Sequence, residues 1–125
     1  MKSYIPKLSD AEWIVMKIIW EKSNTTSPEI IEALRTSTTW SSKTIRTLID
    51  RLVKKGAVKV TKTHSLNEYT PLMSQNELQR FETQSFIKKI YDGSIKLLVA
   101  NFLQEENLTD KEIDELKNIL NQKSK

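Results

Sequence analysis

The sequence predicts a mainly α-helical protein: a winged helix-turn-helix of three helices and a β-hairpin wing, followed by a helical dimerisation domain. Three observations support this fold class. The 125 residues include only two glycines and three prolines, which is typical of helix-rich chains. Three segments begin with the same helix-start motif. Residues 41–62 join an amphipathic helical pattern to a basic, extended one.

The three helix starts are capping boxes, in which a hydroxyl side chain is followed three residues later by glutamate. The hydroxyl accepts a hydrogen bond from the third helical amide, and the glutamate bonds back to the amide of the cap. An apolar residue precedes each cap and can pack against the fourth residue of the helix. The three pairs are Ser9 with Glu12, Ser74 with Glu77, and Thr109 with Glu112.

Two helices are expected before residue 36. The first should run from about residue 10 to residue 22, with its inward face formed by Trp13, Met16, Ile19 and Trp20. The second should begin at Ser27, because serine is a good cap and Pro28 fits the first helical turn. Its buried stripe is expected to contain Ile30, Ile31 and Leu34.

The third helix is the most informative segment. Its apolar residues Ile45, Leu48, Ile49 and Leu52 have the spacing of one buried helical face. The helix should begin at Ser41 or Ser42 and end at Gly56, since glycine is common just beyond a helix. The period then changes to two, with runs at residues 57–63 and 66–72 separated by a break at residues 64–65. That pattern predicts a β-hairpin.

Positive charge is concentrated in the same segment. Residues 41–62 hold seven lysines and arginines against one aspartate, a net charge of +6, whereas the whole chain carries only +4. A helix with one apolar face and one face of basic and hydroxyl side chains suits the DNA major groove. Its long cationic side chains reach phosphates, and its short polar side chains reach base edges. A solvated charged surface is the alternative, and the concentration of charge favours DNA.

The early part of the third helix is expected to reach base edges, as in other helix-turn-helix proteins; its candidates are Lys43, Thr44, Arg46 and Thr47. Arg46 is the candidate for a guanine, because its guanidinium matches O6 and N7. Phosphate contacts are expected from Ser41 or Ser42, whichever does not cap the helix, and from Arg51, Lys54, Lys55, Lys59 and Lys62. For Lys55, an interaction with the helix dipole is an equal alternative. Solvated strand lysines are the alternative for the last two.

From residue 74 onward the chain predicts three further helices, and residues 74–125 carry a net charge of −1 against +5 for residues 1–73. About 50 residues cannot bury all the apolar stripes of these helices alone. An identical partner is the commonest solution, so we expect domains at residues 1–73 and 74–125 and a homodimer. Packing onto the first domain is the alternative. The candidate interface residues are Leu97, Leu98, Phe102, Ile113, Leu116 and Leu120.

Several classes of protein fit the sequence poorly. The chain has no cysteine and one histidine, so it lacks a thiolate metal site, a zinc site and a nucleophile–base pair, and neither an enzyme nor a cofactor or metal is predicted. No unbroken apolar run exceeds four residues, whereas a membrane span needs about 20. With no signal peptide visible, we expect a cytoplasmic protein. A module that binds an acidic protein partner is the alternative function.

Residues 40–56 (WSSKTIRTLIDRLVKKG) resemble the recognition helix of the penicillinase and methicillin-resistance repressors, the BlaI/MecI family. Residues 11–13, 15–16, 18–20, 97–102 and 112–120 also match, so that the resemblance covers nearly the whole chain. It implies a winged-helix dimer that represses transcription by covering a pseudo-palindromic operator with TACA/TGTA elements. It also implies inactivation by proteolysis, after a membrane sensor-protease detects a β-lactam, in the motif matched here by Asn101 and Phe102.

Some features of the family do not carry over. A related copper-responsive branch has a C-terminal cysteine cluster, and this chain has no cysteine, so copper sensing by that route is excluded. The wing residues 63–69 match weakly, so the resemblance assigns no contacts there. The target operon is not fixed by the match. Without the resemblance, Asn101 would be an ordinary polar interruption and Phe102 an ordinary core residue.

Overall fold

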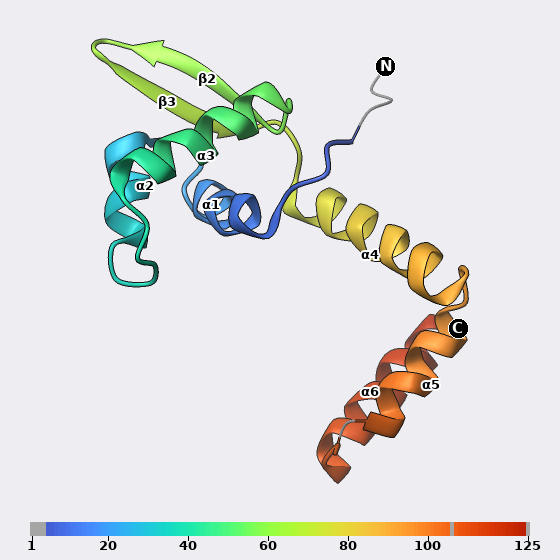
Figure 1. The fold of residues 1–125 in the computed structure, drawn as a ribbon. Helices are drawn as coiled ribbons and strands as arrows, with labels where there is room; N and C mark the ends of the chain where they lie inside the picture. The colour runs from blue at the N-terminus through green and yellow to red at the C-terminus, as the bar shows by residue number, and fades with distance from the viewer. Residues whose placement is uncertain (1–4, 106, 125) are drawn as a thin grey trace. The chain divides into compact units, whose positions relative to one another are not determined.

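The computed structural model describes residues 5–105 and 107–124. These residues form six helices and three short strands (Figure 1). The chain divides into two compact units, Met1–Glu82 and Thr83–Lys125.

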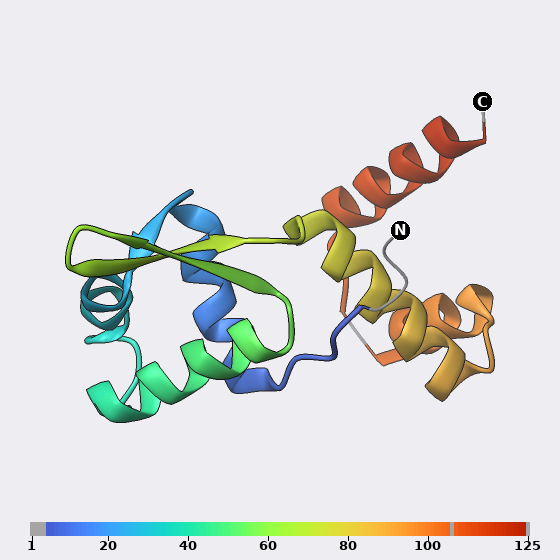
Figure 2. The ribbon, with the colours of Figure 1, turned by 90° about the horizontal axis from the view of Figure 1, so that it is seen from above.

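The N-terminal unit is the predicted winged helix. In chain order it contains α1 (Asp10–Glu21), β1 (Thr25–Thr26), α2 (Ser27–Leu34), α3 (Ser42–Lys54), β2 (Val58–Thr63) and β3 (Leu66–Pro71). The antiparallel sheet has the order β1-β3-β2. In both Figure 1 and Figure 2 the β2–β3 hairpin extends beside α3. The two-residue strand β1 was not predicted.

Local hydrogen bonds explain where the helices begin. At α1 the Glu12 amide donates to Ser9 Oγ at 3.1 Å, and the Ser9 amide donates to Glu12 Oε1 at 2.8 Å. The predicted boxes at Ser74 and Thr109 are also present. The prediction that Ser27 caps α2 was wrong. Thr26, extended at the end of β1, is the cap and forms a capping box with Glu29.

The core of this unit lies between the three helices and the sheet. Fully buried side chains on the helices include Val15, Met16 and Ile19 on α1, Ile30 on α2, and Leu52 on α3. The buried face of α1 is therefore turned around the helix axis from the predicted face: Val15 is buried, and the predicted Trp13 and Trp20 lie at its edge. Its two tryptophans are only partly buried and pack against each other with ring centroids 5.6 Å apart.

The turns after α3 and within the hairpin lie where the sequence predicted them. Gly56 has a φ of +82°, the left-handed conformation that ends many helices. The Ala57 amide donates to the Leu52 carbonyl at 3.0 Å, which satisfies a carbonyl of the last turn. His64, in the hairpin break, also has a positive φ, of +55°. The chain thus leaves the recognition helix directly into the wing.

The C-terminal helices are α4 (Gln75–Tyr91), α5 (Ile95–Glu105) and α6 (Asp110–Lys123). Leu78, near the start of α4, is fully buried in the core of the N-terminal unit. Hence the division between the compact units falls inside α4, later than residue 73. Across the described part of the chain, no helix has both the length and the apolar character needed to cross a membrane.

Candidate nucleic-acid interface

Helix α3 has one buried face and one exposed polar face. Ile45, Leu48, Ile49 and Leu52 are all buried, as predicted. The first turn is fixed by Ser41, whose Oγ accepts from the Thr44 amide at 3.1 Å. Ser41 is therefore the cap, and Ser42 is the first helical residue. The remaining exposed residues predicted to meet DNA are Lys43, Thr44, Arg46, Thr47, Arg51 and Lys54.

Two hydroxyls on this exposed face are already oriented by the helix. Ser41 Oγ donates to Thr44 Oγ1 at 3.1 Å, and Thr47 Oγ1 donates to the Lys43 carbonyl at 3.0 Å. Both threonine hydroxyls therefore already have a hydrogen-bond partner on or beside α3 before any other molecule binds. Preorganised polar groups lose less conformational freedom on binding.

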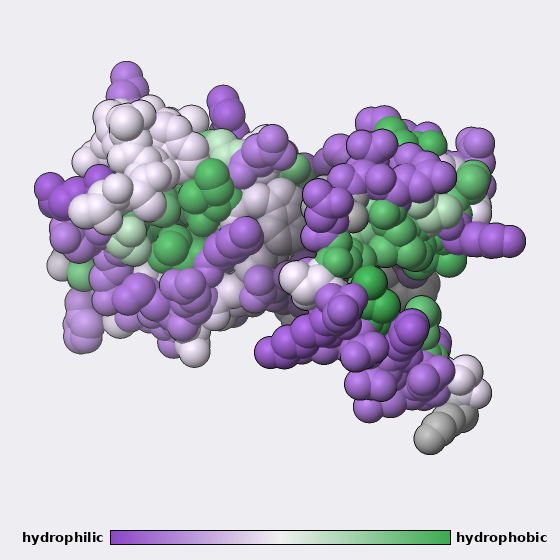
Figure 3. All heavy atoms as spheres, turned by 90° about the horizontal axis from the view of Figure 1, so that it is seen from below, coloured by the Kyte–Doolittle hydropathy of each residue, from purple (hydrophilic) through white to green (hydrophobic). Residues whose placement is uncertain are grey.

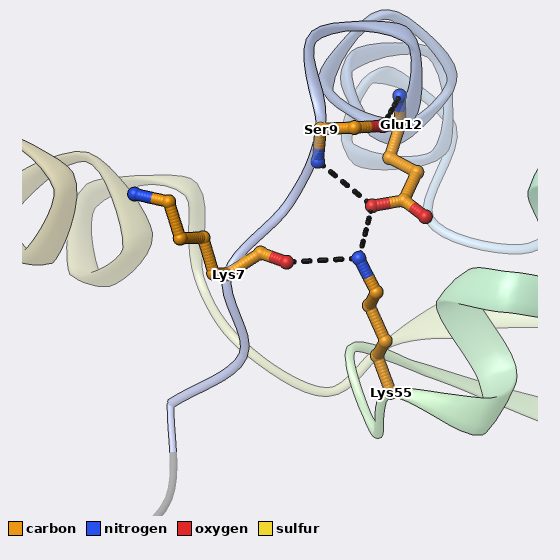
Figure 4. A network of polar contacts seen from close by, with 4 residues as sticks. All are labelled: Lys7, Ser9, Glu12 and Lys55. Carbon is orange, nitrogen blue, oxygen red and sulfur yellow. Dashed lines mark hydrogen bonds and ion pairs between the residues drawn. The ribbon is translucent and has the colours of Figure 1, made fainter.

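Lys55 lies in a different environment from its basic neighbours. Its Nζ donates to Glu12 Oε1 at 2.6 Å and to the Lys7 carbonyl at 2.9 Å (Figure 4). Only 2% of the Glu12 side chain is exposed, compared with 34% of the Lys55 side chain. Lys55 thus joins the end of α3 to the start of α1, a role that the sequence interpretation did not assign to it.

The Glu12 carboxylate is held in its charged form. Burial by itself raises the pKa of Glu12, but the hydrogen bonds from Lys55 and from the Ser9 amide lower it further than burial raises it. The resulting pKa lies below the ordinary value of a glutamate. Glu12 was predicted only as a capping residue. Its spacing to Val15, Met16 and Ile19 was the missed signal that it shares the buried face.

The two wing lysines lie on opposite faces of β2. Because side chains alternate along a strand, Lys62 shares a face with Val60, whose cross-strand partner is the buried Tyr69. Lys59 lies on the other face. Lys62 and Arg46 line one hollow of about 280 Å³, together with Ser27, Pro28, Ser65, Leu66 and Asn67.

The C-terminal unit presents an apolar surface, visible as green side chains among purple ones in Figure 3. No described residue of α5 or α6 is buried. Of the six residues predicted for dimerisation, Leu98 is half-buried and the others are exposed, from 37% for Ile113 to 67% for Leu120. Val99, Leu103 and Ile119 extend this surface. Two hollows, of about 570 and 370 Å³, lie along α5 and α6.

The residues of the predicted cleavage motif lie on α5 in the same unit. Asn101 is exposed, and its Nδ2 donates to the Tyr91 hydroxyl at 3.0 Å. The Phe102 side chain is 50% exposed. The structure thus brings Phe102 to the apolar surface predicted for dimerisation, with Asn101 beside it in the chain.

Comparison with known proteins assigns a family to this architecture. Residues 8–122 match the model of the penicillinase repressor family. The chain belongs to this family. The methicillin resistance regulatory protein MecI of Staphylococcus aureus (strain N315) is 43% identical over 117 residues, which are 94% of this chain and 95% of that protein. The penicillinase repressor of Bacillus licheniformis is 40% identical over 116 residues, which are 93% of this chain and 91% of that protein.

A solved structure of the repressor BlaI matches more than half of this chain. It is the solution structure of the Bacillus licheniformis BlaI monomeric form in complex with the blaP half-operator. The match has 43% identity and a TM-score of 0.53 and covers 59% of this chain and 90% of that chain. The penicillinase repressor family consists of transcriptional repressors rather than enzymes. The sequence resemblance, the winged-helix fold and the non-enzymatic class are therefore confirmed.

Proposed function

We propose that the chain is a homodimeric, DNA-binding transcriptional repressor of the β-lactam-resistance type, which binds a pseudo-palindromic operator. The observation that carries this proposal is the basic, exposed face of α3 on a winged helix, in a family whose Bacillus licheniformis member was solved with a half-operator. The exposed helix enters the major groove, and the wing follows the DNA backbone.

The position of each side chain around α3 supports a division of roles. Lys43, Thr47 and Lys54 lie opposite the buried stripe, because the α-helix turns about 100° per residue. Lys43 and Thr47, in the first turns, reach base edges. Lys54, two turns later, contacts phosphate, as does Arg51 on the flank. Lys55 is excluded from these roles because its ammonium group is engaged by Glu12 and Lys7.

We expect matched lysine substitutions to separate these roles. Lys54→Met should weaken operator and random DNA alike and lower the slope of log affinity against log salt by about 0.9, the value for one neutralised phosphate. Lys43→Met should cost roughly 1–3 kcal/mol of discrimination at one base pair. Binding titrations at several salt concentrations measure both effects. If the chain bound an acidic protein as tightly as operator DNA, the alternative function of a protein-interaction module would be favoured instead.

The dimer follows from the surface of α5 and α6. Large apolar side chains there, including Phe102 and Ile119, remain 50% and 62% exposed in the single chain. Contiguous apolar surface of this kind marks an interaction site, and a second copy of the chain offers an identical, self-complementary surface. Linking two half-site contacts in one molecule raises the overall affinity without any change in the reading helix.

Regulation by proteolysis is the remaining part of the proposal. Asn101 and Phe102 lie in α5, so a protease reaches the bond between them only after local opening of the helix. Cleavage there would separate residues 102–125, and with them α6, from the DNA-binding unit. The dimer would lose covalent connection to half of its apolar surface, and operator binding would weaken.

Cleavage between Asn101 and Phe102 predicts two fragments, residues 1–101 and 102–125, when the chain is co-expressed with its sensor-protease and the inducer is added. Mass spectrometry of the repressor, followed together with reporter expression, measures the cut. Asn101→Ala, which changes the cleavage motif but keeps the apolar side chain of Phe102, should keep the reporter repressed. Derepression with an intact full-length chain would refute cleavage while leaving the DNA-binding proposal in place.

A further inference from the structure

We propose that the hollow between α2, α3 and the wing binds one phosphodiester group of the DNA backbone, held by Arg46 and Lys62 together. This inference rests on the proposed DNA-binding function and assigns a ligand to one pocket of that surface. It changes the role of Arg46 from the guanine contact that the sequence suggested to a phosphate contact.

The hollow is built from four elements of the N-terminal unit. Ser27 and Pro28 come from the first turn of α2, Arg46 from α3, Lys62 from β2, and Ser65, Leu66 and Asn67 from the hairpin turn and β3. Its volume of about 280 Å³ accommodates a group much larger than one water molecule. Five of the seven lining side chains carry groups that can donate hydrogen bonds to an anionic oxygen.

The register of the hairpin turns Lys62 toward the helices. Lys62 pairs with Asn67, and Val60 pairs with Tyr69 on the same face of the ladder. Tyr69 is 6% exposed and belongs to the core. Both Lys62 and Asn67 therefore lie on the face of the sheet that looks toward α2 and α3, whereas Lys59 lies on the outer face.

The position of Arg46 around α3 also favours a phosphate contact. Arg46 follows the buried Ile45 and lies about 100° around the helix from it, on the flank rather than on the side opposite the core. On that flank it meets the first turn of α2 and the tip of the wing at the hollow. A recognition helix presents its central exposed residues to base edges, whereas its flanks lie nearer to the phosphates.

The charge of the hollow selects an anion. Two cations line it and no carboxylate does, and neither cation forms an ion pair among the described residues. An arginine guanidinium matches the geometry of phosphate oxygens, and a lysine ammonium adds a second positive charge. Because the hollow borders the helix proposed to enter the major groove, the phosphate nearest to it belongs to the DNA backbone.

One phosphate shared by Arg46 and Lys62 would also fix the wing against the recognition helix. The hairpin contributes Lys62, Ser65 and Asn67 to the hollow, and α3 contributes Arg46. A single bound group would therefore set the angle between the two DNA-contacting elements. Loss of either cation should weaken binding to all sequences rather than to one base pair.

The test uses the full-length chain and the operator duplex defined by its footprint, with a neutral methylphosphonate replacing one phosphate at a time. For the wild-type chain, one position in each half-site should weaken binding by roughly 10-fold or more. Arg46→Gln and Lys62→Gln should each weaken binding to the native duplex and abolish the penalty at that same position. Lys59→Gln, on the opposite face of β2, should keep the penalty.

Three outcomes would overturn the assignment. The methylphosphonate penalty could disappear at one position in Arg46→Gln and at another in Lys62→Gln, which would show that the two side chains bind different phosphates. Arg46→Gln could lose discrimination at one base pair with every methylphosphonate penalty intact, which would make it a base reader. In the third outcome, no methylphosphonate would weaken binding, but inorganic phosphate would compete with DNA better than chloride does at equal ionic strength. If this competition occurred with the wild type and not with Arg46→Gln, the hollow would be a site for free phosphate. A wild-type chain that protects no DNA would instead remove the proposed function itself.

Discussion

Leu120→Asp is expected to lower the affinity for the full operator by about 10²–10⁴-fold, the range that linking two binding modules typically contributes. Leu120 is 67% exposed in the single chain and lines both apolar hollows of the C-terminal unit. A carboxylate buried in the proposed interface would lack a partner, which is costly in a desolvated contact. Affinity for an isolated half-site should stay the same, because α3 and the wing are unchanged.

Analytical ultracentrifugation and operator titration of the same samples measure this effect. Asn118→Asp is the matched control, because it introduces the same charge on the opposite side of α6, where the side chain is exposed. The control should remain dimeric and bind as tightly as the wild type. If Leu120→Asp remained dimeric, or lost full-site and half-site affinity equally, the assignment of this surface to dimerisation would be wrong.

Lys55→Met is expected to reduce the free energy of unfolding by about 2–3 kcal/mol, less than the figure of about 3–5 kcal/mol for fully buried pairs. The substitution leaves the Glu12 carboxylate, which is 2% exposed, without its ammonium partner. The reduction is smaller than for a fully buried pair because 34% of the Lys55 side chain is exposed and water screens the interaction. Urea unfolding at pH 7 measures the change.

The double variant Glu12→Gln with Lys55→Met should recover much of this stability, since it removes the unpaired charge. Lys54→Met, one residue earlier on an exposed side chain, should cost little. Lys55→Met should also keep the wild-type salt slope of DNA binding, unlike Lys54→Met. If the slope of Lys55→Met fell by about 1, Lys55 would be a phosphate contact instead.

The same ion pair predicts a pH dependence. The pKa of Glu12 is lower in the folded state than its ordinary value. A carboxylate of this kind stabilises the fold at pH values above its unfolded pKa of about 4.3, and the contribution is lost as the pH falls through the lower, folded pKa. The stability difference between the wild type and Glu12→Gln should therefore be full at neutral pH and shrink in the acid range.

The sequence predicted most of the fold because its signals were local. The capping boxes at Ser9, Ser74 and Thr109 require only residues three apart, and the end of α3 at Gly56 requires only one left-handed residue. The cap at Thr26 carries the same local signal, but the adjacent serine–proline pair suggested a later start. The strand β1 has two residues, too few to show a period.

The candidate site was only partly predictable, because its remaining features depend on contacts between distant segments. Glu12 and Lys55 are 43 positions apart in the chain, and no sequence pattern in either helix predicts their ion pair. The hollow at Arg46 depends on the hairpin register that turns Lys62 inward. The apolar stripes of α5 and α6 were visible in the sequence, whereas their exposure in the single chain required the structure.

The central claim is that two copies of this chain read one two-fold operator. DNase footprinting on the DNA flanking its own gene, with increasing full-length protein, tests it most directly. The account predicts one protected region of two inverted half-sites, separated by a whole number of helical turns of about 10–10.5 base pairs, both filled at the same protein concentration. Protection of a single half-site, or uniform protection at the concentrations that coat random DNA, would contradict it.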